Sequence, residues 1–405
     1  MTKPEIRLKG FKGEWVETTI GDVSNSFNYG INAAAMPFDG KNKYLRITDI
    51  DESSHLFDQT NLTSPQGDNS NLDPYLLEKG DITFARTGAS VGKSYIYDQS
   101  DGRVIFAGFL IRIRVNEDVN PHTVFFNTLT KKYAKYISLV SQRSGQPGMN
   151  KNELGNFSFF IPNDKREQQA IVDYFKSLDS MILATMKKIA SLKQIKTASL
   201  VSMFPQAGET KPRVRFNGFD ENWEEYLFGD LYYHNVVKND LSFGVDKVIS
   251  VANMYYNPNT YISDINYLRT YNVFRKGDIA FEGNKSKDFA HGRFVENTIG
   301  DGIISHVFEV FTPINPRHDL LFWKYAINNE RIMGRILLRC TKASTMMTNL
   351  VANDFLKEKI LVPSYEEQKD IGYFFACLDK QISLQEQRLE KLKQIKAACL
   401  DKMFV

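Results

Sequence analysis

One long segment of the chain occurs twice, and this repeat constrains the fold more than any other feature. Residues 167–204 read EQQAIVDYFKSLDSMILATMKKIASLKQIKTASLVSMF, and residues 367–404 read EQKDIGYFFACLDKQISLQEQRLEKLKQIKAACLDKMF. The copies align without a gap at a constant offset, and the run Leu-Lys-Gln-Ile-Lys starts at Leu192 and again at Leu392. Internal repetition of this kind predicts two structural units of one type.

Apolar residues in both copies alternate at intervals of four and three, which indicates the seam of a coiled coil. The seam comprises Ile171, Phe175, Leu178, Ile182, Ile189, Leu192, Ile371, Phe375, Leu378, Ile382, Leu389 and Leu392. Thr185 and Gln385 interrupt it at one equivalent position. Each helix is predicted to be roughly 55 to 60 Å long and to pack on the other copy. Periodicity allows either direction, and a pseudo-twofold relation between the copies favours antiparallel packing.

The segments before the two helices also repeat, but their offset drifts. Pro4 to Phe11, followed by Trp15, matches Pro212 to Phe219, followed by Trp223. Strand-like runs follow at 43–50 and 247–254, at 79–84 and 276–281, and at 103–115 and 303–311, with helices predicted at 121–142 and 319–338. Both globular parts are therefore predicted to be α+β with one element order. Their variable loops suit two differently tuned recognition surfaces.

Composition is that of an ordinary globular protein, with 42% hydrophobic and 24% charged residues. The three cysteines have no paired spacing, which suits a reducing compartment. No apolar run approaches the roughly 18 residues of a membrane span. We therefore expect a soluble, cytoplasmic protein. A net charge of +3 is weak support for nucleic-acid binding, so any basic surface must be local.

A glycine-containing loop at 86–94, Arg-Thr-Gly-Ala-Ser-Val-Gly-Lys-Ser, invites comparison with a nucleotide phosphate loop. Only three residues separate Gly88 from Gly92, where a P-loop needs four, and the second copy lacks the pattern. We interpret the loop as facing DNA phosphate, with a solvated hairpin tip as the alternative. Its candidate residues are Arg86, Thr87, Lys93 and Ser94.

Polar segments at 141–151 and 339–349 precede the last strand of each globular part. Their Arg, Gln, Asn, Ser and Thr side chains are types that reach base edges in a DNA groove, and an ordinary surface loop remains the alternative. The candidate DNA contacts here and in the neighbouring strands and loops are Lys43, Arg46, Arg143, Ser144, Gln146, Asn150, Asn284, Lys285, Lys287, Arg293, Arg339, Lys342, Ser344 and Thr345.

No catalytic constellation emerges from the sequence. It contains no Asn-Pro-Pro-aromatic tetrad for an exocyclic amine, no dinucleotide fingerprint and no clustered metal ligands. These absences favour a binding subunit that is not an enzyme, with no catalytic residue and no metal site.

The doubled order of these signatures resembles the specificity subunit of a Type I restriction-modification system. The resemblance rests on Pro-x-hydrophobic-Arg-hydrophobic-x-Gly-Phe with Trp, on Lys-Gly-Asp-Ile, and on the helix starts at 162–168 and 363–368, each present in both halves. It implies target recognition domains at 1–160 and 209–361 and conserved spacer helices at 161–208 and 362–405. The second domain departs from the first because Gly283 to Lys287 replaces the glycine-containing loop, so the two DNA contacts need not be equivalent.

The resemblance also implies a function. Each domain would read half of a split double-stranded DNA target, and the helices would act as a ruler between half-sites about one to one and a half turns apart. Two methyltransferase subunits would methylate adenine, and two motor-nuclease subunits would cleave unmodified DNA. S-adenosylmethionine, ATP and Mg²⁺ are expected on those partners, and no cofactor is expected on this chain. Competing interpretations are a stand-alone regulator that binds a bipartite DNA site and a coiled-coil adaptor without a DNA role.

Overall fold

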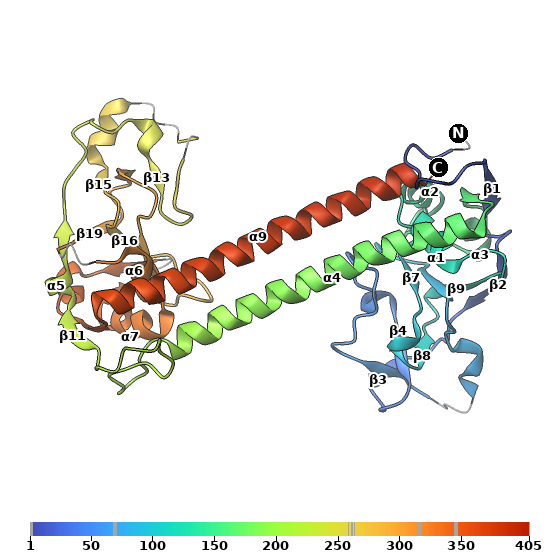
Figure 1. The fold of residues 1–405 in the computed structure, drawn as a ribbon, viewed down its shortest axis with the longest axis horizontal. Helices are drawn as coiled ribbons and strands as arrows, with labels where there is room; N and C mark the ends of the chain where they lie inside the picture. Colours follow the sequence, from blue (N-terminus) through green and yellow to red (C-terminus); the bar gives the residue numbers. More distant parts are fainter. Residues whose placement is uncertain are drawn as a thin grey trace. The chain divides into compact units, whose positions relative to one another are not determined.

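The computed structural model describes residues 3–67, 71–257, 259–260, 262, 264–314, 318–343 and 347–404. The chain divides into two compact units. Figure 1 shows the fold with colours that follow the sequence from the N-terminus to the C-terminus. Unit 1 contains Met1–Met186 and Arg388–Val405, and unit 2 contains Lys187–Gln387. Each long helix therefore contributes one half to each unit. The prediction of two α+β units joined by long helices is confirmed.

Unit 1 is built around a four-stranded antiparallel sheet in the order β2-β9-β6-β7, with the pair β1-β10 beside it. Its elements are β1 Trp15–Thr19, β2 Ser24–Tyr29, β3 Ala35–Pro37, β4 Lys43–Leu45, β5 Thr63–Pro65, β6 Ile82–Ala85, β7 Ser94–Ile96, β8 Val104–Phe106, β9 Leu110–Val115, α1 Pro121–Asn127, α2 Lys131–Val140, α3 Lys151–Gly155 and β10 Ser158–Pro162. The long helix α4, Lys165–Ser202, follows.

Unit 2 repeats this plan, with the sheet β12-β19-β16-β17 and the pair β11-β22. Its elements are β11 Glu224–Leu227, α5 Phe228–Leu231, β12 Tyr232–Asn235, β13 Ile249–Ser250, β14 Tyr255–Tyr256, β15 Asn272–Phe274, β16 Ile279–Glu282, β17 Arg293–Glu296, β18 Gly302–Ile304, β19 Glu309–Pro313, α6 Leu320–Ala326, α7 Glu330–Cys340, β20 Thr341–Ala343, β21 Thr348–Leu350, α8 Ala352–Phe355, β22 Lys359–Val362 and α9 Tyr365–Met403.

Several predicted elements are shorter than expected or divided. The helix predicted at 121–142 is α1 and α2, because the Thr130 side chain accepts from Tyr133 N and starts a new helix. Asn329 likewise starts α7, so the helix predicted at 319–338 is also two. The strand predicted at 43–50 ends at Leu45, because the Asp49 carboxylate bonds Arg46 N and closes a 3-10 turn. Short polar side chains compete with the regular backbone ladder at each of these points.

The long helices pack antiparallel in each unit taken separately. In unit 1, Asp179 of α4 pairs with Lys396 of α9 at 2.6 Å, and Tyr174 bonds Cys399. In unit 2, Lys196 pairs with Asp379 at 2.6 Å and Lys193 with Glu386 at 2.7 Å. Residue numbers rise along one helix as they fall along the other, which defines the direction. At 38 and 39 residues the helices are about 57 Å long.

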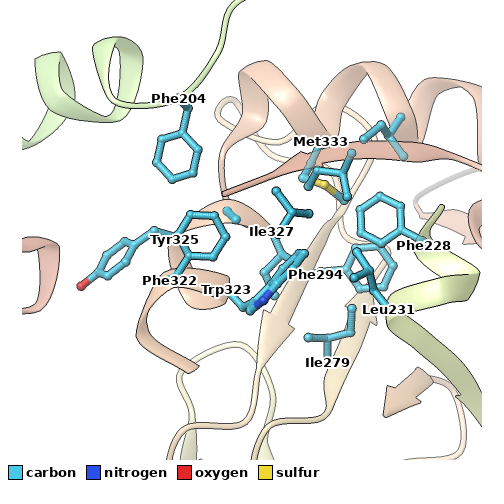
Figure 2. Close-up of a cluster of buried hydrophobic side chains, with 14 of the residues drawn as sticks. Phe204, Phe228, Leu231, Ile279, Phe294, Phe322, Trp323, Tyr325, Ile327 and Met333 are labelled. Carbon is cyan, nitrogen blue, oxygen red and sulfur yellow. The ribbon is translucent and has the colours of Figure 1, made fainter. Parts of the chain in front are cut away.

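The predicted seam residues serve the globular cores as well as the helix pair. Ile171, Phe175 and Leu178 belong to the main core of unit 1, together with Trp15. Ile371, Phe375, Leu378, Ile382 and Leu192 belong to the main core of unit 2, and Figure 2 shows part of that cluster around Phe322 and Trp323. Ile189 is also buried, whereas Ile182, Leu389 and Leu392 are half-buried. The start of each long helix is thus anchored in its own unit.

A buried ion pair fixes each long helix to the segment that leads into its unit. Glu167 in the first turn of α4 is 1% exposed and accepts two hydrogen bonds of 2.7 Å from the Arg7 guanidinium. In unit 2, Arg215 binds Glu367 in the same bidentate way, at 2.6 and 2.7 Å. The carboxylate raises the pKa of Arg7, chiefly through its hydrogen bonds. The bidentate geometry gives both oxygens of each buried carboxylate a hydrogen-bond partner, which offsets the cost of burying the glutamate.

Replacing Arg7 by Met leaves the Glu167 carboxylate buried without its partner. We expect the Arg7→Met change to lower the free energy of unfolding by about 3 kcal/mol, measured by urea denaturation of the full chain. The double variant Arg7→Met with Glu167→Leu removes both charges and should recover most of that loss. A single variant as stable as the parent would contradict this role of the pair.

A buried aspartate occupies the same position in both units, but its surroundings differ. Asp81, in the Lys-Gly-Asp-Ile turn of unit 1, lies 3.1 Å from Arg114 Nε and 3.8 Å from an Arg112 nitrogen. Its counterpart Asp278 accepts a 2.7 Å bond from the Thr312 hydroxyl, and burial raises its pKa to about 6. Unit 2 thus lacks the two arginines that neutralise this position in unit 1.

Glu296, on strand β17 of unit 2, is also buried, and neither carboxylate oxygen has a hydrogen-bond partner among the described residues. Burial, with a smaller contribution from Asp319, raises its pKa well above the usual range. The folded state therefore holds this proton at a pH where the unfolded chain releases it. Stability contributed by unit 2 should fall as pH rises above the ordinary glutamate pKa.

A Glu296→Gln variant mimics the protonated side chain and removes this dependence. We expect its melting temperature to exceed that of the parent by about 3 °C at pH 8, with the difference shrinking towards pH 4. Two of the three tryptophans, Trp223 and Trp323, are buried in unit 2, so a Trp15→Phe background lets their fluorescence report that unit. The exposed Glu221→Gln serves as the control. An equal shift at both pH values would be inconsistent with a protonated Glu296.

Candidate nucleic-acid interface

The two polar segments singled out in unit 1 lie side by side. Gly88 N donates to Pro147 O at 3.0 Å, and Met149 N donates to Arg86 O at 2.8 Å. A bridge between Thr87 and Gly148 completes the pairing. The loop at 86–94 and the segment at 141–151 therefore form one continuous surface at the end of strand β6.

Unit 2 brings its equivalent segments together in the same manner. Thr348 N donates to Gly283 O at 2.8 Å, and Asn284 bridges Met347. The approach is so close that a Cβ on Gly283 would lie 2.1 Å from Thr348 O, which explains glycine at this point. Ser344 and Thr345, which were predicted to contact DNA, lie outside the described residues.

Glycine shapes the loop of unit 1 for the same kind of reason. Gly88 and Gly92 have φ values of +81° and +86°, in the region that side chains disfavour. A Cβ on Gly92 would also lie 2.7 Å from the Ile137 side chain. The backbone therefore folds tightly against helix α2 between these glycines, and the arrangement differs from a nucleotide loop.

Two predicted phosphate contacts in this loop face inwards. Ser94 is fully buried, and its hydroxyl is 2.7 Å from the Thr128 hydroxyl. The prediction that Ser94 faces phosphate is therefore wrong, because strand β7 begins there and turns the side chain into the core. Lys93 Nζ bonds Ile50 O at 2.9 Å and the Glu52 carboxylate at 2.8 Å, so its charge is already compensated.

Several other predicted cations also have partners within their own unit. Arg46 binds Asp49, Arg143 binds Glu153, Arg293 binds Glu282 and Arg339 binds Glu358, while Lys43 Nζ donates to Gln59 and to Asp101 O. The hydrogen bonds that Arg46 and Arg339 donate to their carboxylate partners raise the pKa of both guanidinium groups. Exposed ion pairs contribute only about 0 to 1 kcal/mol, so a phosphate can compete for the guanidinium groups of Arg46, Arg143 and Arg339, which are 36%, 40% and 56% exposed.

The remaining candidates are open at the surface. Arg86, Lys285, Lys287 and Lys342 form no ion pair with any carboxylate in the described part of the chain. Ser144, Gln146 and Asn284 are exposed and Thr87 is half-buried. Asn150 is exposed, but its side chain accepts from Glu153 N and caps helix α3. These residues, with the paired arginines at their edge, give both units a polar surface of hydrogen-bonding and cationic groups.

Sequence reasoning missed Tyr29, Lys151 and Phe109 at this surface of unit 1. Tyr29 ends strand β2, and its ring lies 4.6 Å from the Arg86 guanidinium carbon and 4.4 Å from Lys151 Nζ. No sequence motif links these three positions, because they come from separate elements that only the folded sheet and helix α3 bring together. Phe109, 59% exposed in the turn before β9, accepts a backbone hydrogen bond from Arg86 and also went unnoticed.

Among the described residues, no group of three His, Cys, Asp or Glu is placed to hold a metal ion. A cavity of about 800 Å³ lies in unit 2 beside helix α7, and a mostly apolar cavity of about 650 Å³ lies in unit 1 beside helix α1. None of the described helices is both long enough and apolar enough to cross a membrane.

Known proteins share this organisation. A family model described as the Type I restriction modification DNA specificity domain matches residues 12–194 and again 221–394. The Type I restriction-modification S subunit from M. genitalium is similar at 14% identity and a TM-score of 0.60, over 100% of this chain and 99% of that chain. A chain from a structure on complex assembly and conformational transition of the type I R-M system is similar at 14% identity and a TM-score of 0.54, covering 96% and 97%.

The two family matches coincide with the two halves of the duplicated chain, and each includes the paired loops and most of a long helix. The fold of the S subunit structures agrees with this assignment over the full length. The chain belongs to the family of Type I restriction-modification DNA specificity proteins.

Proposed function

We propose that this chain is the DNA-reading subunit of a Type I restriction-modification complex and that each unit reads one half of a bipartite duplex target. One observation carries the proposal. In each unit, two equivalent loops pair with each other at the equivalent sheet. The side chains that these loops present differ between the units. A constant scaffold with two different polar surfaces suits recognition of two different half-sites.

The long helices support a second part of the proposal, in which they fix the separation between the half-sites. Helices α4 and α9 each run from one unit into the other and align at a constant offset. At about 57 Å, each is long enough to span one to one and a half turns of duplex. The base pairs between the half-sites would then be spanned without being read.

Exposed apolar residues on the long helices favour a protein partner. Leu384 is 51% exposed, Ile195 is 45% exposed and the equivalent Ile395 is 38% exposed. Ile195 and Ile395 occupy equivalent positions of the duplicated helix, and an apolar side chain exposed in both copies suits two copies of one partner. We propose two methyltransferase subunits here, joined in the restriction complex by two motor-nuclease subunits. A stand-alone regulator would not need these residues exposed.

The chemistry is proposed to belong to those partners. S-adenosylmethionine would bind the methyltransferase, which acts on an adenine that has left the base stack, and ATP and Mg²⁺ would bind the motor-nuclease. This chain would contribute recognition and positioning without catalysis. The paired loops fit that role because they offer hydrogen-bond donors and cations in place of an acid-base pair.

The target can be determined by mapping N6-methyladenine in DNA from cells that express this chain with its methyltransferase. We expect methylation within one bipartite sequence that has a fixed spacer. Deleting residues 187–190 and 387–390 shortens both helices by about one turn and should shorten the tolerated spacer by about one or two base pairs. Unchanged methylation at the parental spacing would refute the ruler, and a continuous target would refute recognition by two units.

The docking surface can be tested by co-purification. A Leu384→Glu change places a charge on the exposed apolar face and should reduce recovery of the methyltransferase about tenfold. Gln381→Glu, at an exposed position one turn away, adds the same charge and should leave recovery unchanged. Equal recovery with both variants would place the partner on another surface.

A further inference from the structure

Three side chains from separate elements of unit 1 meet beside the paired loops. Tyr29 ends strand β2, Arg86 follows strand β6, and Lys151 is the first residue of helix α3. The Tyr29 ring is 36% exposed, and both cationic groups lie within 5 Å of its centroid, at 4.6 and 4.4 Å. The ring therefore holds two positive charges at the solvent boundary.

The backbone fixes this cluster before any ligand binds. Arg86 N donates to Phe109 O and Arg86 O accepts from Met149 N, so the residue is held on both sides. Lys151 Nζ donates to Phe27 O at 2.9 Å, which ties the side chain to strand β2. Tyr29 is held in register opposite Ile111. Because these groups are already ordered, little conformational entropy is lost when they bind a ligand.

The charges in the cluster lack the compensation that other cations of unit 1 have. Lys93 pairs with Glu52, Arg143 with Glu153 and Arg46 with Asp49. Neither Arg86 nor Lys151 forms an ion pair with a carboxylate in the described ranges. Two like charges on one ring repel each other, and the ring quadrupole offsets only part of that repulsion. An anion beside both cations would relieve it.

We propose that Tyr29, Arg86 and Lys151 form a binding site for a backbone phosphate of duplex DNA. This inference rests on the proposed function, because it places the DNA backbone at the paired loops of unit 1. Arg86 and Lys151 supply the charge, and Tyr29 sets their positions without contacting a base. The site gives affinity and register and carries no sequence information.

Unit 2 has no such cluster at the equivalent positions. Strand pairing makes Val236 the counterpart of Tyr29, since Phe84 and Ile111 of unit 1 correspond to Phe281 and Glu309. The same alignment puts Gly283 at the place of Arg86 and Ala352 at the place of Lys151. The two units would therefore bind their half-sites differently. Binding of the half-site read by unit 1 should depend more strongly on salt concentration.

The test measures the salt dependence of DNA binding by the full chain. The probe is a fluorescein-labelled duplex of about 40 base pairs of mixed sequence, titrated between roughly 50 and 200 mM KCl. Arg86→Gln and Lys151→Gln should each weaken binding and reduce the slope of log K against log salt by about 0.9. Lys151→Arg keeps the charge and should keep the slope. Arg166→Gln removes an exposed charge at the start of α4 and serves as the control.

Tyr29 is tested by a matched pair of variants. Tyr29→Phe keeps the ring and should bind like the parent, whereas Tyr29→Leu should bind several-fold more weakly with its slope unchanged. Melting temperatures separate these effects from loss of folding. Parental slopes in both glutamine variants, or a reduced slope in Lys151→Arg, would overturn the site while leaving DNA recognition intact. A parent chain that binds no duplex at any salt would instead overturn the proposed function.

Discussion

The bidentate pairs Arg7–Glu167 and Arg215–Glu367 are the interaction on which the architecture depends. Each glutamate lies in the first turn of a long helix, and each arginine lies in the segment that leads into the same unit. The neighbouring glutamines add to the restraint, because Gln168 bonds Pro162 O and Asn120 N, while Gln368 bonds Pro363 O and Asp319 N. The direction of each helix relative to its own sheet is therefore set by buried polar geometry, which tolerates little adjustment.

On this fixed frame the two units differ in charge. Unit 1 compensates its buried aspartate with arginines and exposes a cluster of two cations on Tyr29. Unit 2 gives Asp278 and Glu296 no ion pair among the described residues, and it presents Val236 and Gly283 where unit 1 has aromatic and cationic groups. Duplication preserved the packing, and the solvent-facing ends of the strands diverged. That division is expected where packing constrains the core and function varies at the loops.

The long helices, the α+β class and the order of elements follow from the sequence, since the repeat and the apolar periodicity report packing directly. The burial and the contacts of the candidate side chains do not follow from the sequence. Lys93 and Glu52 are 41 positions apart, and Tyr29 and Arg86 are separated further, so their meeting depends on how strands pair across the sheet. Ser94 shows the same limit, because one residue of strand register decides between the core and the surface.

The division of each long helix between the units has a consequence for the order of events during synthesis. Unit 1 takes Leu400, Met403 and Phe404 from the end of α9 into its core, where Phe404 stacks on Phe175 and contacts Trp15. The amino-terminal half of the protein therefore cannot complete its core until the last helix has left the ribosome. Until then it must persist with an apolar face uncovered, although its sheet can form early. Chaperone demand should accordingly fall on the nascent first half of the chain.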